Sequence, residues 1–223
     1  MPPLPATFDY RPPPGVEIVH ADGRLVVCDK PSGLLTVAGK DPSLGDCLEA
    51  RVQALYPNHP ATKVVHRLDK DTSGLLLLAL DKPALAYLGR QFEHREIDKY
   101  YIARVWGDVA GESGLVDLPL ATDWDNKPRQ RVDHERGRPA QTRWEVLARE
   151  GSVTRLKLTP LTGRTHQLRV HMLALGHPIV GDSFYAKGDA LVAADRLQLH
   201  AEMLQFAHPD DGRVMRLASP APF

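Results

Sequence analysis

The segment HRLDKDTSG, residues 66–74, gathers the side chains in this sequence that are best suited to do chemistry. Asp69 and Asp71 lie among basic residues, and six apolar residues follow directly at positions 75–80. Basic neighbours favour the ionised form of a carboxylic acid, and an ionised carboxylate can act as a nucleophile or as a base. One interpretation is therefore a reactive Asp69 at the mouth of a site, held in place by the rigid strand behind it.

Two other interpretations of this segment start from the same residues. Thr72, Ser73 and Gly74 are loop formers, so the segment is also typical of a solvated turn that leads into a core strand. Its spacing further matches the first half of a calcium-binding EF-hand loop. The last position of that loop is here Leu80 rather than a glutamate, and flanking helices are missing, which excludes calcium. Periodicity alone favours the turn, so the choice depends on the rest of the chain.

A second group of candidate residues lies in GRTHQLRVHMLALG, residues 163–176. Thr165 can cap a helix, three apolar residues share one helical face, and Gly176 stands where a helix commonly ends. The pattern predicts a helix over 165–175. Because a helix N-terminus offers unpaired amide groups and a positive dipole end, we expect a phosphate site there, next to Arg164.

Arg169 stands one turn into this predicted helix, between Leu168 and Val170. A guanidinium group that is partly buried among apolar neighbours requires a carboxylate partner, and Asp69 is the partner that we predict. The alternative is that Arg169 extends into solvent, as most helical arginines do.

The charges of the whole chain limit the kind of partner. Lysine and arginine number 28, as do aspartate and glutamate, which excludes a strongly basic protein that coats nucleic acid indiscriminately. A local basic cluster nevertheless occurs within residues 126–143, and it contains Lys127, Arg129, Arg131, Arg136, Arg138 and Arg143. The cluster indicates a polyanion site, although each arginine alone is equally typical of a solvated strand face.

The elements that must position these groups alternate between helices and strands. We expect helices from Ser43 to about Tyr56 and from Asp81 to about Arg95, and a turn-rich stretch over 107–128. Strands are predicted at 18–30 as a hairpin, 75–80, 100–107, 129–135, 139–148, 152–160, 197–208 and 213–219. Strands outnumber helices and often adjoin as hairpins, which predicts an α/β (α+β) fold with a mixed, mostly antiparallel sheet flanked by helices.

Residues 1–15 carry six prolines and predict an extended arm, followed by one domain over 16–223. Cys28 and Cys47 are the only cysteines, so we expect buried thiols and neither a disulfide framework nor a thiolate zinc site. His166 and His171 lack the spacing of two ligands on one helix face, and we predict no metal. No leader and no apolar run of membrane-spanning length occurs, which indicates a cytoplasmic protein without membrane partners.

Four blocks in order resemble the successive motifs of the RluA-type pseudouridine synthases: KPSGLLTV (30–37), HRLDKDTSGLLLLA (66–79), KYYIARVWG (99–107) and GRTHQLRVHMLALGHPIVGD (163–182). GLVDLPLATDWDNKPRQRV (114–132) and GRPAQTRWEV (137–146) resemble the dual-specificity RluA branch in particular. The resemblance implies the pseudouridine synthase fold for the domain over 16–223. The motifs begin so early that we expect no S4-like RNA-binding domain before them.

The resemblance also implies roles for individual residues. Asp69 matches the catalytic aspartate, Tyr101 the tyrosine that stacks on the target uracil and assists deprotonation, and Arg169 the basic residue that pairs with the aspartate. Arg67 matches the residue that evicts the target base and fills its place. Further RNA contacts are expected from His66, Arg164, His166, Lys127, Arg129 and Arg131.

The implied reaction converts uridine to pseudouridine in loops of RNA, where a base leaves its stack at lower cost. By resemblance, the substrates are stem-loops of 23S ribosomal RNA and the tRNA anticodon loop at position 32. No cofactor is required. Asp69 can abstract the 2′ proton, attack C1′ or add to uracil C6, and the sequence leaves these routes open. Two alternatives are an RNA-binding protein of the same fold without catalysis and a nucleoside hydrolase. We expect a monomer because no repeated apolar stripe needs a partner.

Overall fold

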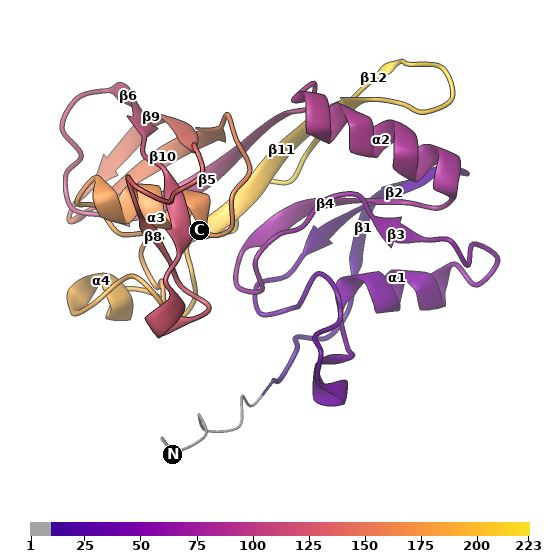
Figure 1. Ribbon diagram of the computed structural model, residues 1–223, viewed down its shortest axis with the longest axis horizontal. Coiled ribbons are helices and arrows are strands. Elements are labelled where there is room, and N and C mark those ends of the chain that lie inside the picture. Colours follow the sequence, from indigo (N-terminus) through magenta and orange to yellow (C-terminus); the bar gives the residue numbers. More distant parts are fainter. Residues whose placement is uncertain (1–9) are drawn as a thin grey trace.

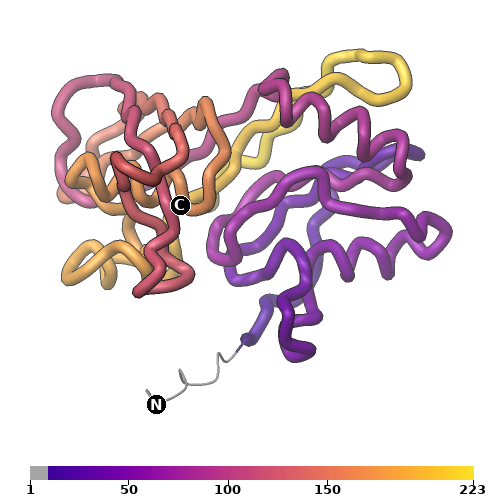
Figure 2. The backbone as a smooth tube through the Cα atoms, viewed as in Figure 1, coloured from indigo at the N-terminus to yellow at the C-terminus, as the bar shows by residue number. Residues whose placement is uncertain are grey.

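The computed structural model describes residues 10–223, so most of the predicted proline-rich arm lies outside the described residues. The described chain forms two lobes that share one continuous sheet (Figure 1). Figure 2 shows the chain passing from the first lobe to the second along β5 (Asp98–Trp106) and returning along β11 (Leu199–Ala207).

The first lobe contains the amino-terminal part of the described chain. Two helices lie on opposite faces of its strands (Figure 1). Its elements are β1 (Glu17–Ala21), β2 (Leu25–Lys30), α1 (Leu48–Leu55), β3 (Lys63–Val64), β4 (Ser73–Ala79) and α2 (Lys82–His94). The strand β12 (Val214–Ala218) pairs with β11 and closes the chain.

The second lobe packs one helix against the other half of the sheet and carries a separate two-stranded hairpin, β7–β8. Its elements are β6 (Ser113–Asp117), β7 (Leu120–Thr122), β8 (Gln130–Val132), β9 (Gln141–Glu150), β10 (Val153–Pro160), α3 (Gln167–Ala174) and α4 (Asp189–Val192).

The large sheet has ten strands among the described residues, with the path β1-β2-β4-β11-β5-β10-β9-β6. All of its pairs are antiparallel except β4 with β11, where His200 is opposite Ser73. The predicted mixed, mostly antiparallel sheet flanked by helices is therefore confirmed. Because β4 and β5 both pair with β11, segments on either side of the lobe junction are joined through one strand.

The unbroken apolar run after the 66–74 segment is explained by β4, which is covered on both faces. Leu75 and Leu77 pack with α2 residues, whereas Leu76 and Leu78 pack with α1 residues. A strand that is buried on both faces is apolar at every position, not at alternate ones. Burial of each such leucine stabilises the fold by about 1.5–3 kcal/mol, so β4 is a rigid base for the loop that precedes it.

Several predicted boundaries were wrong. Ser43 does not start α1; it lies in a 3-10 turn whose cap is Asp41, and the helix begins only after Gly45 and Asp46, with Cys47 as its N-cap. The stretch predicted as turns over 107–128 contains β6 and β7. By contrast, α2 begins at the predicted Asp81 cap, whose carboxylate accepts the amide of Ala84.

Cys28 and Cys47 are both free and buried, as predicted. Across residues 10–223, no helix has both the length and the apolar character needed to cross a bilayer.

Candidate active site

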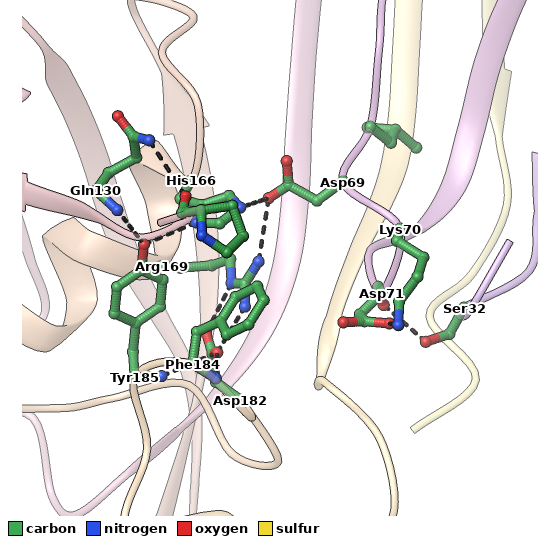
Figure 3. A network of polar contacts seen from close by, with 12 residues as sticks. Ser32, Asp69, Lys70, Asp71, Gln130, His166, Arg169, Asp182, Phe184 and Tyr185 are labelled. Atoms are coloured by element: carbon green, nitrogen blue, oxygen red, sulfur yellow. Dashed lines mark hydrogen bonds and ion pairs between the residues drawn. The ribbon is translucent and has the colours of Figure 1, made fainter. Parts of the chain in front are cut away.

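Asp69 lies at the junction of the two lobes, on the loop directly before β4, and projects towards Arg169 and His166 of the second lobe (Figure 3). Its carboxylate is 3.4 Å from the Arg169 guanidinium and 3.9 Å from His166 Nε2. The prediction that Asp69 and Arg169 meet is confirmed. A pair 100 residues apart in sequence thus joins the two lobes at one point.

The loop that carries Asp69 is hydrogen-bonded to the segment around Lys30. The Lys30 ammonium group is fully buried and donates to the carbonyl oxygens of Pro31, Leu34 and Lys70, at 2.8–2.9 Å. The amide of Gly33 donates to the same Lys70 carbonyl. Burial lowers the pKa of Lys30 to about 7, although the nearby aspartates oppose this shift. Two hydrogen bonds to the Lys70 carbonyl therefore fix the backbone directly after Asp69.

Arg169 is buried, with 2% of its side chain exposed, but its main partner is not the one predicted. Asp182, which is fully buried, binds the guanidinium through both oxygens at 2.8 and 2.7 Å. Burial alone lowers the pKa of Arg169, but the hydrogen bonds and charge of Asp182, followed by the charge of Asp69, raise it above its ordinary value. Arg169 is thus a permanent cation between one tight and one looser carboxylate, and it does not extend into solvent.

His166 stands beside Asp69 and links it to the β7–β8 hairpin. Its Nδ1 is 2.7 Å from the Tyr185 hydroxyl, whose oxygen accepts the amide of Gln130 at 2.8 Å (Figure 3). Burial lowers the pKa of His166, so the ring is neutral at pH 7. When Tyr185 donates its proton to Nδ1, the ring's own proton is on Nε2, the nitrogen nearest Asp69.

The helix of this segment starts later than predicted. His166 has left-handed backbone geometry (φ 54°), and α3 begins at Gln167 instead of Thr165. The Gln167 side chain, not Thr165, accepts the amide of Arg164 at 3.0 Å. This amide is consequently not free for a ligand, and a phosphate site at the start of α3 stays a prediction.

Tyr101 is half-buried on β5 and packs against the cores of both lobes. Burial and then the charge of Asp69 raise the pKa of Tyr101, so it is a neutral phenol at pH 7. Its position between the cores and within the field of Asp69 agrees with the predicted site.

His66 and Arg67, both predicted RNA contacts, are placed differently. The His66 ring stacks on Phe92, with centroids 4.6 Å apart, and its Nε2 accepts the amide of Leu77 at 3.1 Å. Burial lowers the pKa of His66 to about 3, which preserves this acceptor. Arg67 is exposed, two residues from Asp69. The structure therefore commits the His66 ring to holding the loop and leaves Arg67 accessible.

The remaining predicted RNA contacts lie on the hairpin and beside it. Lys127 and Arg131 are exposed, and Arg129 is partly exposed. Arg131 and Arg164 line a cleft of about 410 Å³ between the hairpin and the start of the α3 segment. Sequence reasoning missed Asp182, Tyr185 and Trp124, although the first lies within the 163–182 block and the last within the 114–132 block. Within residues 10–223, no cluster of three or more His, Cys, Asp or Glu side chains could hold a metal ion.

Residues 24–174 match the protein family described as RNA pseudouridylate synthase. The chain belongs to this family. Among its relatives, the dual-specificity RNA pseudouridine synthase RluA of Vibrio vulnificus (strain CMCP6) is 48% identical over 225 residues, which cover 98% of this chain and 89% of that protein. RluA of Escherichia coli (strain K12) is 50% identical over 218 residues, which cover 96% and 98% respectively.

A solved structure agrees with the fold. Human RNA Pseudouridylate Synthase Domain Containing 1 is 29% identical, with a TM-score of 0.76, over 94% of this chain and 84% of that one. This pseudouridylate synthase is therefore an isomerase that modifies RNA, as the order of its motifs predicted. The pseudouridine synthase fold is likewise confirmed.

Proposed function

We propose that this synthase isomerises loop uridines in two classes of RNA, a hairpin of 23S ribosomal RNA and the tRNA anticodon loop at position 32, with Asp69 as the catalytic residue. The observation that carries the proposal is the placement of Asp69 at the lobe junction, 3.4 Å from the buried Arg169 cation. Relatives named dual-specificity synthases, about half identical over nearly the whole chain, support two substrate classes.

Asp69 is suited to start the reaction because it is held firmly and yet remains accessible. Its side chain is 27% exposed, so a uridine can approach it, and the negative charge of the carboxylate faces the Arg169 guanidinium 3.4 Å away. Each of the three routes open to a carboxylate, namely proton abstraction, attack on C1′ or addition to C6, requires that charge. No cofactor or metal takes part in any of them.

Tyr101 and Arg67 have complementary roles in this proposal. The neutral phenol of Tyr101 forms a flat surface next to Asp69 on which the uracil stacks, and it assists deprotonation. Removing a uridine from its stack costs about a few kcal/mol, and less in a loop than in a helix. The exposed Arg67 takes the place that the base leaves. The substrates are therefore loops, recognised through splayed bases and arginine contacts.

We further propose that the protein is a monomer and acts in the cytoplasm, where ribosomal RNA and tRNA are both present. The RNA is contacted by Lys127, Arg129, Arg131 and Arg164. His166 was also expected to contact RNA, but its ring is buried, so we propose that it instead supports Asp69.

Release of tritium from RNA labelled at uracil C5 tests the proposal. The substrates are a tRNA anticodon stem-loop and a 23S hairpin, and the variants are Asp69→Asn and, as matched control, Asp71→Asn. Asp71 is two residues away with a similar exposure of 24%, but its carboxylate faces Lys70 at 3.3 Å. We expect release by wild type and the control, and at least a thousandfold loss in Asp69→Asn.

The alternatives give other results. A nucleoside hydrolase releases free uracil and leaves an abasic site, whereas an isomerase conserves the RNA mass. A binding protein without catalysis holds both RNAs but releases no tritium. Activity of Asp69→Asn together with an inactive Asp71→Asn contradicts the assignment of the catalytic residue.

A further inference from the structure

Trp124 is an exposed aromatic side chain of the second lobe, and the proposed reaction assigns no role to it. It lies at the tip of the β7–β8 hairpin, and 72% of its surface is accessible. Among the large hydrophobic side chains exposed in residues 10–223, it is the one aromatic residue. Exposure of so large a ring loses the stabilisation that burial provides, which points to a binding role.

The indole has one face that is already occupied. The Lys127 ammonium group is 3.8 Å from the ring centroid, within cation–π distance. The tip itself is closed by backbone bonds, since Asp123 and Arg129 pair and the amide of Asn126 donates to Asp123. The ring is thus held on a rigid turn, with a cation on one side and solvent on the other.

The cleft next to Trp124 is lined by four arginines and one carboxylate, Asp133, which pairs with Arg131 at 3.2 Å. Its volume of about 410 Å³ is within the range of about 300–1,000 Å³ typical of small-ligand sites. Arg136, Arg138 and Arg164 line it, and no carboxylate of residues 10–223 lies within ion-pair distance of them. Burial lowers the pKa of Arg164, and the charges of Arg138 and Arg95 lower it further. Uncompensated like charges of this kind are stabilised by an anion.

One wall of the cleft is adjacent in sequence to a residue that contacts Asp69. Gly163, Arg164 and Thr165 form one wall, and the next residue, His166, is 3.9 Å from Asp69. The opposite wall is the hairpin, whose Gln130 amide binds Tyr185, the hydrogen-bond partner of His166. A nucleotide that neighbours the target uridine can therefore reach the cleft while the uridine is at Asp69.

We propose that this cleft binds a second, non-reacting nucleotide of the RNA loop, with its base stacked on the open face of Trp124 and its phosphate held by Arg136, Arg138 and Arg164. The inference rests on the proposed function, because it assumes that a loop uridine occupies the site. Stacking on an indole ring accepts any of the four bases, but the distance between Trp124 and Asp69 fixes which loop nucleotide, counted from the target uridine, can stack. Trp124 thus selects loops in which a neighbouring base is also turned out.

Binding of the anticodon stem-loop to Trp124→Ala and Trp124→Phe tests the stacking contact, in an Asp69→Asn background that prevents turnover. We expect the Kd of Trp124→Ala to rise about 5- to 150-fold, the loss typical of one stacked base, and Trp124→Phe to retain most of the affinity. Val192→Ala is the control, since Val192 is 77% exposed elsewhere on the second lobe. Its Kd should stay within twofold of the parent.

Abasic replacement at each loop nucleotide identifies the stacked base. The abasic replacement that weakens RNA binding by the parent protein should cause no further loss of affinity in Trp124→Ala, because both changes remove the same stacking contact. For the phosphate, Arg138→Gln should reduce the slope of log Kd against log salt by about 0.7, the value for one single-strand contact, whereas Trp124→Ala should leave it unchanged.

The outcomes separate this inference from the proposed function. If the protein with Asp69 intact releases no tritium from either RNA, the proposed function fails and the inference falls with it. If it releases tritium, but Trp124→Ala binds within twofold of its parent and no abasic position couples to it, the inference alone is overturned.

Discussion

Asp182→Asn and Asp69→Asn remove the two carboxylates that flank Arg169, and they should differ sharply in stability. Asp182 is fully buried and binds the guanidinium through two short bonds. Removing one partner of a buried ion pair costs about 3–5 kcal/mol, because the other charge stays buried and uncompensated. Asp69 remains 3.4 Å from Arg169 and offsets part of this loss, so we expect about 3 kcal/mol for Asp182→Asn.

The Asp69→Asn change should cost at most about 1 kcal/mol. Its carboxylate is 27% exposed and its contact with Arg169 is longer, so solvent screens most of the interaction. Urea unfolding, followed by tryptophan fluorescence, gives both free energies. The total stability of a domain is about 5–15 kcal/mol, so a loss of 3 kcal/mol is easily measured as a lower midpoint at unchanged slope.

Equal losses in the two variants, or a larger loss in Asp69→Asn, refute the reasoning that Asp182 balances the buried charge while Asp69 is left for the reaction. The double variant provides a second check. With both carboxylates gone, Arg169 has no counter-charge, so the combined loss should exceed the sum of the single losses.

Two further perturbations concern the loop of Asp69. Lys30→Met should lower the unfolding free energy by about 1–3 kcal/mol and slow tritium release, because three buried carbonyl oxygens, including that of Lys70, lose their donor. Wild-type rates of tritium release in a folded Lys30→Met variant would show that these hydrogen bonds do not position Asp69. The pKa of His66 is lowered to about 3 in the fold, so its ring stays neutral there, whereas in the unfolded chain it takes up a proton below about pH 6.5. The unfolding free energy should therefore fall by about 1.4 kcal/mol per pH unit as the pH drops from 6.5 towards 3. Urea midpoints at pH 7 and 5 for wild type and His66→Gln measure this, and identical pH slopes exclude it.

The sequence predicted those elements whose signals are local. The continuous apolar run of β4 and the Asp81 cap of α2 depend on neighbouring residues, and the structure has both. Ser43 failed as a cap because Gly45 and the tight bond of Asp41 to the Ser43 amide favour a separate 3-10 turn. A cap residue indicates a helix start only when the residues after it can continue the helix.

The site divides in the same way. Asp69, Tyr101 and Arg169 were recognised from motifs, and the structure brings them together at the lobe junction. Asp182 was not, because a buried arginine shows that it needs a carboxylate but not which one, and the choice depends on how the 175–182 segment returns past α3. Trp124 could have been suspected only from exposure, which the sequence does not reveal.

The unequal sharing of Arg169 between two carboxylates has a chemical meaning. A carboxylate with both oxygens in short hydrogen bonds to a guanidinium has its lone pairs engaged and is a poor nucleophile or base. Asp182 takes that place, and its remaining bonds go to the amides of Phe184 and Tyr185. Asp69 contacts the same cation through one oxygen at a longer distance, so it receives the favourable field while its lone pairs stay available. Because Arg169 is fixed from its own lobe, its field is in place before the RNA arrives, and in the proposed reaction binding need only bring the uridine to Asp69.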